Sequence, residues 1–496
     1  MTISEEIYRD KVHGCWLGKS IGGTIGGPLE GKTDFFDLPF TYPRETIAND
    51  DLDLQLVWLK VLRESGLRIT ADDLAAAWLD HIVYPFDEYG VALANLKMGL
   101  KPPVTGYYNN WFKDSMGSPI RSELWACLFP GRPATAAWYA LQDAQVDHWG
   151  EGVYGEIFFA ALESLAFDHE DVAALVSQAL AFIPEDCRVY QAVSMVTRSF
   201  ADGESLLNSR NEVLASFRND NFTDAPQNMA FTILGLLHGG GDLLKSVIFA
   251  AKCGYDVDCT AATAGAVAGI LAGGKAVLAA ADADIDDRVV AGWGIQNCDV
   301  PETLSELTDQ TVSLGSLADQ EADLPELEAP FILPEIPPFE APMRIPCHYD
   351  LVPDDIGDSQ PLLTESAQEV TFEGAFFDVE DLLTSDDDML VLETCLNLPF
   401  ARTLRFIPHC TGPVALWVDN RKVVEWTTSA PFVPAAHRGP QGHDRMNWDM
   451  LNLDEGVHEV TIRVKHPSDG RRLELAWLAV DEDNHWIPDL VYELKP

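Results

Sequence analysis

Apolar positions spaced three and four residues apart dominate the first three hundred residues of the chain. Residues with this spacing share one face of a helix, so the pattern predicts amphipathic helices over 153–167, 171–182, 229–237 and 243–251. Glycine- and proline-rich turn signals lie between or before them, and strand-like alternation is scarce. We therefore predict an all-α domain over residues 1–300.

The pattern changes beyond residue 300. The stretch 324–346 is rich in proline and acidic residues, which favours an extended connector, placed at 301–345. Apolar residues then alternate with polar or small ones in three segments, and turn signals such as Asp419-Asn420 lie beside them. This period of two predicts an antiparallel β-sandwich over residues 346–496. The three segments are 414–418, 457–464 and 473–480.

Composition narrows the class of protein. A chain of 496 residues exceeds one ordinary core, which agrees with at least two domains. Its net charge of −46 repels a phosphate backbone, so nucleic-acid binding is not expected. Nine cysteines without a CxxC pair are typical of a reducing compartment, and the charged N-terminus is unlike a signal peptide. We expect a cytoplasmic protein, and we interpret the Gly/Ala-rich stretch 261–281 as a buried helix, not a membrane span.

Two short acidic clusters stand in apolar surroundings. They are residues 49–53 (NDDLD) and 256–260 (DVDCT), and each runs into an apolar helical pattern. Carboxylates at the start of an apolar helix are costly unless they cap the helix, pair with a cation or bind a metal ion. Either cluster alone fits helix capping. If the two meet in space, they form an oxygen-rich site suited to Mg²⁺, Mn²⁺ or Ca²⁺.

A glycine pattern near the N-terminus is the third notable feature. Glycines at 14, 18, 22 and 26 recur every four residues and so lie on one helix face, where another helix can approach closely. Gly18-Lys19-Ser20 also matches the end of a phosphate-binding loop. The first glycine of that motif would fall on His13, and no strand precedes it, so we set that interpretation aside. Gly26-Gly27-Pro28 ends the helix and leaves Glu30 on a loop.

Taken together, these segments resemble the ADP-ribosylglycohydrolase family. The shared pattern is a glycine-laced first helix followed by a loop Glu, an acidic cluster opening the next helix, and a late G-x-D-x-D-x-x-A-A-x-x-G helix. Segments 117–121 and 147–152 also fit, and the resemblance covers about residues 8–280 in the expected order. It implies an all-α fold with a two-metal site, usually of Mg²⁺, whose ions hold ribose hydroxyls and a water. The implied reaction is hydrolysis of an N- or O-glycosidic bond of ADP-ribose or a related sugar.

The resemblance also assigns roles to residues of this chain. For two of these residues the residue type itself favours a structural role: Arg121 as an ion-pair residue and His148 as a histidine satisfied by its neighbours. The implied metal ligands are Asn49, Asp50, Asp51, Asp256, Asp258 and Cys259; the implied catalytic residues are Glu30 and Asp51; the implied substrate contacts are Gly117, Arg121 and His148.

The chain departs from the family pattern at several of these positions. The family usually has Thr where Asn49, Leu52 and Cys259 stand, and Asp where Lys19 stands. Leu52 cannot bind a metal, and Cys259 is a soft ligand that suits Mg²⁺ poorly, although Thr260 is adjacent. These differences favour one metal ion over two. Asp53 is either a local replacement or a helix-start acid.

The C-terminal segments 412–423 and 453–464 resemble accessory β-sandwich modules of carbohydrate-active enzymes, which favours a free sugar or glycoside as substrate. Tryptophans there are expected in the core, while exposed ones could stack on sugars. We predict a metal-dependent glycohydrolase acting on a small sugar, glycoside or ADP-ribosyl substrate, with no membrane partner. The alternative is a non-catalytic family member that binds a sugar or nucleotide. The polar and aromatic candidates in this region are Trp417, Trp426, His437, Arg438, Trp448 and Trp477.

Overall fold

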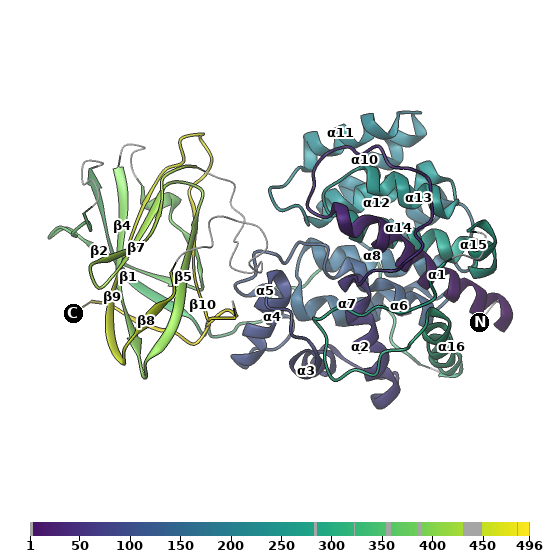
Figure 1. Ribbon diagram of the computed structural model, residues 1–496, viewed down its shortest axis with the longest axis horizontal. Helices are drawn as coiled ribbons and strands as arrows, with labels where there is room; N and C mark the ends of the chain where they lie inside the picture. The colour runs from purple at the N-terminus through teal and green to yellow at the C-terminus, as the bar shows by residue number, and fades with distance from the viewer. Residues whose placement is uncertain are drawn as a thin grey trace. The chain divides into compact units, whose positions relative to one another are not determined.

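The computed structural model describes residues 3–281, 285–321, 323–353, 359–383, 388–429, 449–483 and 485–495. These form two compact units, one helical and one built mainly of strands (Figure 1). The predicted fold class, an all-α domain followed by antiparallel sheets, is confirmed. The helical unit comprises Met1–Tyr84, Lys101–Tyr107 and Phe112–Ile336; the sheet unit comprises Pro85–Leu100, Tyr108–Trp111 and Pro337–Pro496.

The helical unit contains the glycine-laced first helix and both acidic clusters. Its helices are α1 (Glu5–Gly26), η1 (Gly27–Leu29), α2 (Asp50–Ser65), α3 (Ala71–His81), α5 (Val104–Tyr107), η2 (Pro119–Arg121), α6 (Ser122–Leu128), α7 (Pro133–Asp147), α8 (Glu151–Leu165), α9 (Val172–Leu180), α10 (Arg188–Ala201), α11 (Leu206–Phe217), α12 (Ala225–Gly239), α13 (Leu243–Lys252), α14 (Val257–Ala272), α15 (Gly274–Ala280) and α16 (Leu304–Gln320).

The helices predicted from apolar spacing correspond to α8, α9, α12 and α13, with ends shifted by a few residues. Helix α16 lies within the stretch predicted as a connector, and the described residues between it and Arg344 form no helix or strand. Among the described residues, no single helix is long and apolar enough to cross a membrane. Helices α14 and α15 reach that length only together, and they bend by 108° at the break between them.

The packing of α1 against α14 confirms the role predicted for the recurring glycines. A Cβ atom built on Gly18 would lie 1.9 Å from the carbonyl oxygen of Gly265, and one on Gly14 would lie 2.1 Å from that of Gly269. No side chain fits at such distances, so the two helices touch backbone to backbone. The same contact continues to Gly26, at the first turn of α14.

The sheet unit contains a seven-stranded and a four-stranded sheet, and every described strand pair is antiparallel. The larger sheet has the order β2-β1-β4-β9-β6-β7 with β11 paired to β4, and the smaller has the order β3-β10-β5-β8. The strands are β1 (Arg344–Pro353), β2 (Gln368–Glu373), β3 (Phe376–Asp378), β4 (Asp388–Leu398), β5 (Arg402–Cys410), β6 (Val414–Val418), β7 (Arg421–Trp426), β8 (Leu451–Leu453), β9 (Gly456–Lys465), β10 (Glu474–Val480) and β11 (Val491–Glu493).

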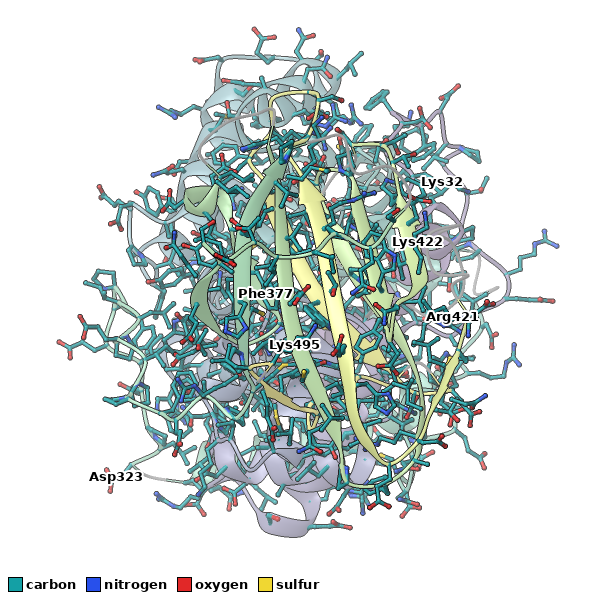
Figure 2. All side chains as sticks on the ribbon, turned by 90° about the vertical axis from the view of Figure 1, so that its left-hand side faces the viewer. Lys32, Asp323, Phe377, Arg421, Lys422 and Lys495 are labelled. Atoms are coloured by element: carbon teal, nitrogen blue, oxygen red, sulfur yellow. The ribbon has the colours of Figure 1, made fainter. Side chains whose placement is uncertain are left out.

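Three of these strands, β6, β9 and β10, match the segments predicted from alternation. The β6–β7 hairpin turns at Asp419 and Asn420, whose φ angles of 49° and 65° are those of a tight hairpin turn. Elsewhere in the sheet unit, the side chain of Phe377 on β3 is buried in the core, whereas the side chains of Lys422 on β7 and of Lys495 are partly exposed to solvent (Figure 2).

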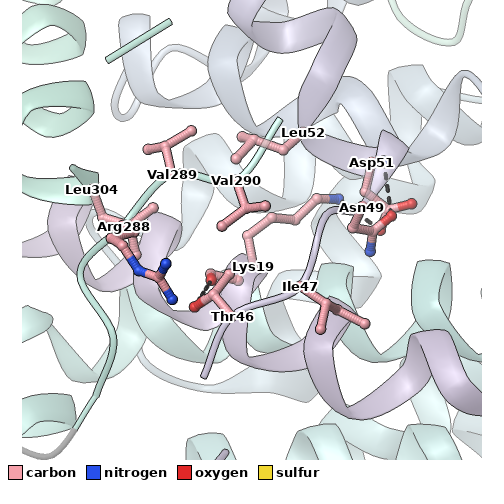
Figure 3. A pocket seen from close by; sticks show the side chains of 11 residues that line it. Lys19, Thr46, Ile47, Asn49, Asp51, Leu52, Arg288, Val289, Val290 and Leu304 are labelled. Carbon is pink, nitrogen blue, oxygen red and sulfur yellow. Dashed lines mark hydrogen bonds and ion pairs between the residues drawn. The ribbon is translucent and has the colours of Figure 1, made fainter. Parts of the chain in front are cut away.

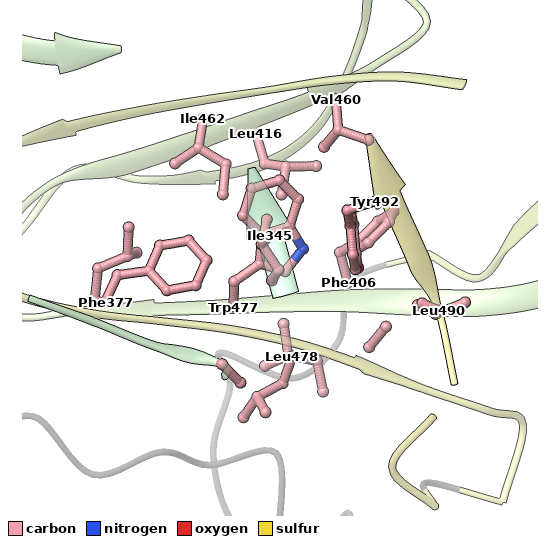
Figure 4. Packing of buried hydrophobic residues seen from close by; sticks show 14 of the residues in the cluster. Ile345, Phe377, Phe406, Leu416, Val460, Ile462, Trp477, Leu478, Leu490 and Tyr492 are labelled. Carbon is pink, nitrogen blue, oxygen red and sulfur yellow. The ribbon is translucent and has the colours of Figure 1, made fainter. Parts of the chain in front are cut away.

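The core of the sheet unit surrounds Trp477 on β10 (Figure 4). Its ring lies 5.9 Å from that of Phe377 and 5.6 Å from that of Tyr492. Trp477 is buried in this core and Trp426 packs against it, as expected. Trp417 is also buried, but outside this cluster and 5.3 Å from the Arg463 guanidinium. His437, Arg438 and Trp448 lie outside the described residues.

One helix of the sheet unit comes from far upstream in the chain. Helix α4 (Asp87–Lys97) contributes Val91 and Ala94 to the sheet core. Asn95 on this helix donates a hydrogen bond of 2.7 Å to the carbonyl oxygen of Tyr108. The Tyr108 hydroxyl in turn donates to the carbonyl oxygen of Met343, at 3.2 Å. The sequence pattern alone placed this segment in the helical domain.

Candidate active site

The first acidic cluster forms the start of α2. Asn49 is the N-cap residue, and its Oδ1 accepts a hydrogen bond of 3.0 Å from the backbone N–H of Asp51. Asp53 points elsewhere, because its carboxylate accepts hydrogen bonds from the Tyr84 hydroxyl (2.6 Å) and from the backbone of Gly292 (2.8 Å). Asp53 is therefore a structural acid in this structure, and Asp50 and Asp51 remain as candidate ligands.

The second acidic cluster forms the start of α14 and meets the first. Asp256 is the N-cap residue, held by a hydrogen bond from its backbone N–H to Asn228 Oδ1 at 3.2 Å. The Cys259 thiol donates to Asp51 Oδ1 at 3.4 Å, across the two helices. One possible metal-ligand atom from each of Asp51, Asp258 and Cys259 lies within 4.8 Å of the other two. The two clusters thus converge, as the hypothesis of a metal site requires.

Helix α1 holds both clusters in place through its glycines. A Cβ atom on Gly26 would lie 2.4 Å from the Cα of Asp258, and one on Gly23 would lie 2.2 Å from Asn49 Nδ2. The end of α1 therefore touches the first turn of α14 and the N-cap of α2 at once. Larger residues at these positions would push the carboxylates apart.

The loop that bears Glu30 is tied to the second cluster by backbone hydrogen bonds. The N–H of Gly31 donates to the carbonyl of Tyr255 at 2.9 Å, and the N–H of Tyr255 donates to that of Lys32 at 2.7 Å. Glu30 itself is exposed, yet its charge contributes to raising the pKa of Asp256 and of Asp258. It therefore lies at the solvent side of the cluster.

The electrostatics of the cluster favour a bound cation. Burial, followed by repulsion from neighbouring carboxylates, raises the pKa of Asp50, Asp256 and Asp258 well above the usual range. Three buried oxygens, Asp51 Oδ2, Asp256 Oδ2 and Asp258 Oδ1, have no hydrogen-bond partner among the described residues. Buried carboxylate oxygens without hydrogen bonds, on acids of two converging clusters, fit the ligand set of a divalent metal ion.

Lys19 places one fixed positive charge beside this cluster. Its buried ammonium donates to Glu123 Oε1 at 2.7 Å and to the carbonyl of Ile120 at 2.8 Å, and lies 3.5 Å from Asp51 Oδ2. Burial lowers the pKa of Lys19, but the carboxylates of Glu123 and Asp51 more than offset this, so the pKa is raised. The side chain is charged and occupies one side of Asp51.

A small pocket opens next to Asp51 (Figure 3). Polar groups of Lys19, Asn49 and Asp51 form one part of its wall, and Leu52, which cannot bind a metal, lines it as well. The remaining lining residues are Ser20, Thr46, Ile47, Arg288, Val289, Val290 and Leu304.

Comparison with known proteins decides the family. The sequence model of the ADP-ribosylglycohydrolase family matches residues 4–316, which is well over half of the chain. The chain belongs to the ADP-ribosylglycohydrolase family. Membership supports a glycohydrolase-type function and agrees with a metal-dependent site.

Other comparisons add less to the assignment. A solved structure titled "ADP-ribosylglycohydrolase-related protein complex" is 17% identical, with a TM-score of 0.45, and the match covers 63% of this chain and 99% of that one. A search of curated proteins finds no match to this chain. The assignment to the ADP-ribosylglycohydrolase family therefore rests on the sequence match.

The residues that the family resemblance assigns to substrate are buried in ion pairs and a turn. Arg121 is fully buried, with its guanidinium 2.8 Å and 2.7 Å from the two oxygens of Asp147 and 3.0 Å from Asp143 Oδ1. His148 is also fully buried, 3.0 Å from Asp147 Oδ1, and Gly117 is buried in the turn before η2. This geometry favours the structural roles of Arg121 and His148, and their contact with substrate stays a prediction.

The Arg121–Asp147 pair predicts a specific pH dependence of stability. Burial alone would raise the pKa of Asp147, but Arg121 and His148 hold it at about 2, below its ordinary value of 3.8. A carboxyl group whose pKa is lower in the folded than in the unfolded protein stabilises the fold at pH values above its unfolded pKa. This stabilisation is lost as the pH falls towards the folded pKa. Between pH 5 and pH 3, the free energy of unfolding should fall by about 1 kcal/mol more in the wild type than in Asp147→Asn. Urea unfolding of both proteins at each pH measures this difference. An equal fall of the free energy of unfolding in the two proteins would contradict the prediction.

Proposed function

We propose that this protein is a divalent-metal-dependent glycohydrolase that cleaves an N- or O-glycosidic bond of ADP-ribose or a related sugar or glycoside. The observation that supports the proposal most is the meeting of Asp51 with Asp258 and Cys259, from the first turns of two distant helices, with buried oxygens left unsatisfied. Asn49, Asp50 and Asp256 border the same site and complete the proposed ligand set.

The residues of the chain suit glycoside cleavage in the following way. Asp51, Asp256 and Asp258 would hold one divalent ion, which, when bound, lowers the pKa of a water and fixes vicinal hydroxyls. Lys19 neutralises part of the charge on Asp51, which favours a single ion over two. Glu30, at the solvent side, would exchange a proton with the water or the leaving group.

A product screen tests the proposal. The full chain is stripped of metal by a chelator, resupplied with one divalent ion at a time, and incubated with ADP-ribosyl substrates and simple glycosides. Hydrolysis that disappears with chelator and returns with the ion is the expected result. Ion binding without turnover on any of these substrates would favour the non-catalytic alternative, in which the altered ligands support binding alone.

Glu30 gives a prediction separate from metal binding. Glu30→Gln removes the proton-exchanging carboxylate without adding bulk to the exposed loop, so kcat should fall by about 10²-fold. The free energy of unfolding should change little, because Glu30 is exposed. The affinity for the divalent ion should fall much less than kcat, because Glu30 is outside the ligand group and only its nearby charge is lost. Steady-state kinetics and ion titration of the same preparation measure both. An unchanged kcat would remove Glu30 from the catalytic residues.

A further inference from the structure

Cys259 occupies a position that an all-oxygen metal site would give to a hydroxyl or carboxylate. It is in the first turn of α14, is 8% exposed, and its sulfur lies 3.4 Å from Asp51 Oδ1. A thiolate and a carboxylate oxygen bound to one tetrahedral ion, with bonds of about 2.3 Å and 2.0 Å, are separated by about 3.5 Å. The spacing therefore already matches shared coordination.

The surrounding oxygens point to the same conclusion independently of the sulfur. Asp258 is 5% exposed, and its Oδ1 has no hydrogen-bond partner among the described residues. Asp51 is 1% exposed, and its Oδ2 has no hydrogen bond there and only the Lys19 ammonium at 3.5 Å. Such oxygens are costly to bury unless a cation satisfies them. One carboxylate oxygen of Asp51, one of Asp258 and Cys259 Sγ lie within 4.8 Å of one another.

The other cysteines lie outside the candidate metal site. All nine lie in the described part of the chain, and Cys259 alone belongs to a group of candidate ligands found there. The thiol of Cys253, for example, donates to the carbonyl of Phe249, and that of Cys298 donates to the carbonyl of Leu56. Among the described residues, Cys259 is therefore the cysteine that lies in a group of three candidate ligands.

We propose that Cys259 is a ligand of the bound ion and shifts the preference of the site from Mg²⁺ towards thiophilic divalent ions such as Zn²⁺. The inference rests on the proposed metal-dependent function and specifies the ion. Sulfur ligands select Zn²⁺ and similar ions, whereas Mg²⁺ requires a shell of oxygens. On binding, the thiol proton of Cys259 is released to solvent and the sulfur coordinates as the thiolate.

Cobalt is a suitable probe, because Co²⁺ bound to a thiolate gives a charge-transfer absorption in the near ultraviolet. The metal-free full chain is titrated with Co²⁺, and the bound Co²⁺ is then displaced with Zn²⁺ or Mg²⁺. The wild type should show the band. Cys259→Ser, which replaces the thiol by a hydroxyl, should bind Co²⁺ without it. The ratio of the Mg²⁺ to the Zn²⁺ dissociation constant should fall by at least about tenfold in that variant.

Cys298→Ser is the matched control and should retain both the band and the ion preference, since Cys298 lies outside the cluster. Circular dichroism of each variant verifies folding, and Cys259→Ala provides a second variant should the serine disturb the helix start. Co²⁺ binding to the wild type without the band, or a band that persists in Cys259→Ser, would overturn the proposed role of Cys259. Either result would leave the proposed metal-dependent function standing. Failure of the wild type to bind any ion would instead contradict the proposed function itself.

Discussion

Replacement of Asp258 by Asn is expected to lower the rate of hydrolysis by about 10³-fold, while the protein stays folded. The carboxylate of Asp258 is one of the three donor groups that converge in the site, and one of its oxygens has no hydrogen-bond partner among the described residues. An amide keeps the shape of the side chain but removes the negative charge that a divalent ion requires. Burial and neighbouring acids raise the pKa of Asp258, so its negative charge is unfavourable in the folded protein. Removal of that charge should therefore not weaken the fold.

Asp242→Asn provides the matched control for this variant. Asp242 starts the preceding helix, α13, and its Oδ1 caps the backbone N–H of Lys245 at 2.9 Å. Asparagine caps equally well, so this variant should keep wild-type activity and stability. The rate of hydrolysis at a fixed ion concentration and the midpoint of thermal unfolding, measured for both variants, test these expectations. Undiminished turnover in Asp258→Asn would contradict the proposed site.

Replacement of Gly18 by Ala is expected to have the largest effect on stability, a loss of at least about 3 kcal/mol in the free energy of unfolding. The added methyl group would lie 1.9 Å from the carbonyl oxygen of Gly265, and backbone on both sides leaves no flexible side chain to move away. Helices α1 and α14 must separate to admit it. Since α14 begins with Asp256 and Asp258, we expect ion affinity to fall as well.

Gly27→Ala is the control, because its Cβ would meet only the end of the Ile47 side chain, at 3.0 Å, and its φ of −50° suits any residue. That variant should change the free energy of unfolding by less than about 1 kcal/mol. Denaturant unfolding of both variants gives the comparison. Equal stability of Gly18→Ala and the wild type would show that the close contact of α1 with α14 is not as the structure has it.

Periodicity and local chemistry predicted much of this architecture. Apolar spacing identified helices such as α8 and α13, alternation identified strands β6 and β10, and the four-residue glycine repeat predicted a close helix contact that the structure places between α1 and α14. These features depend on neighbours within one helix or strand, which a sequence shows directly.

What the sequence did not show depends on contacts between distant residues. Helix α4 has ordinary helical spacing, and only the tertiary structure reveals that Val91 joins the sheet core. Lys19 gave a signal as a charged residue within a glycine-rich apolar helix, but its partner Glu123 lies far along the chain. For Asp53 the sequence left open a replacement ligand or a helix-start acid, and only the hydrogen bond from Tyr84 shows that it is held away from the site.

Calorimetric titration of the metal-free wild-type chain with a divalent ion tests the central claim most directly. The meeting of the two acidic clusters, with Lys19 beside Asp51, predicts saturable binding of one ion per chain. Asp51→Asn should weaken that binding by at least about tenfold, because one charged ligand is lost. Absence of binding by Zn²⁺, Mn²⁺, Mg²⁺ and Ca²⁺ alike, or equal affinity in Asp51→Asn, would contradict a metal site at the junction of α2 and α14.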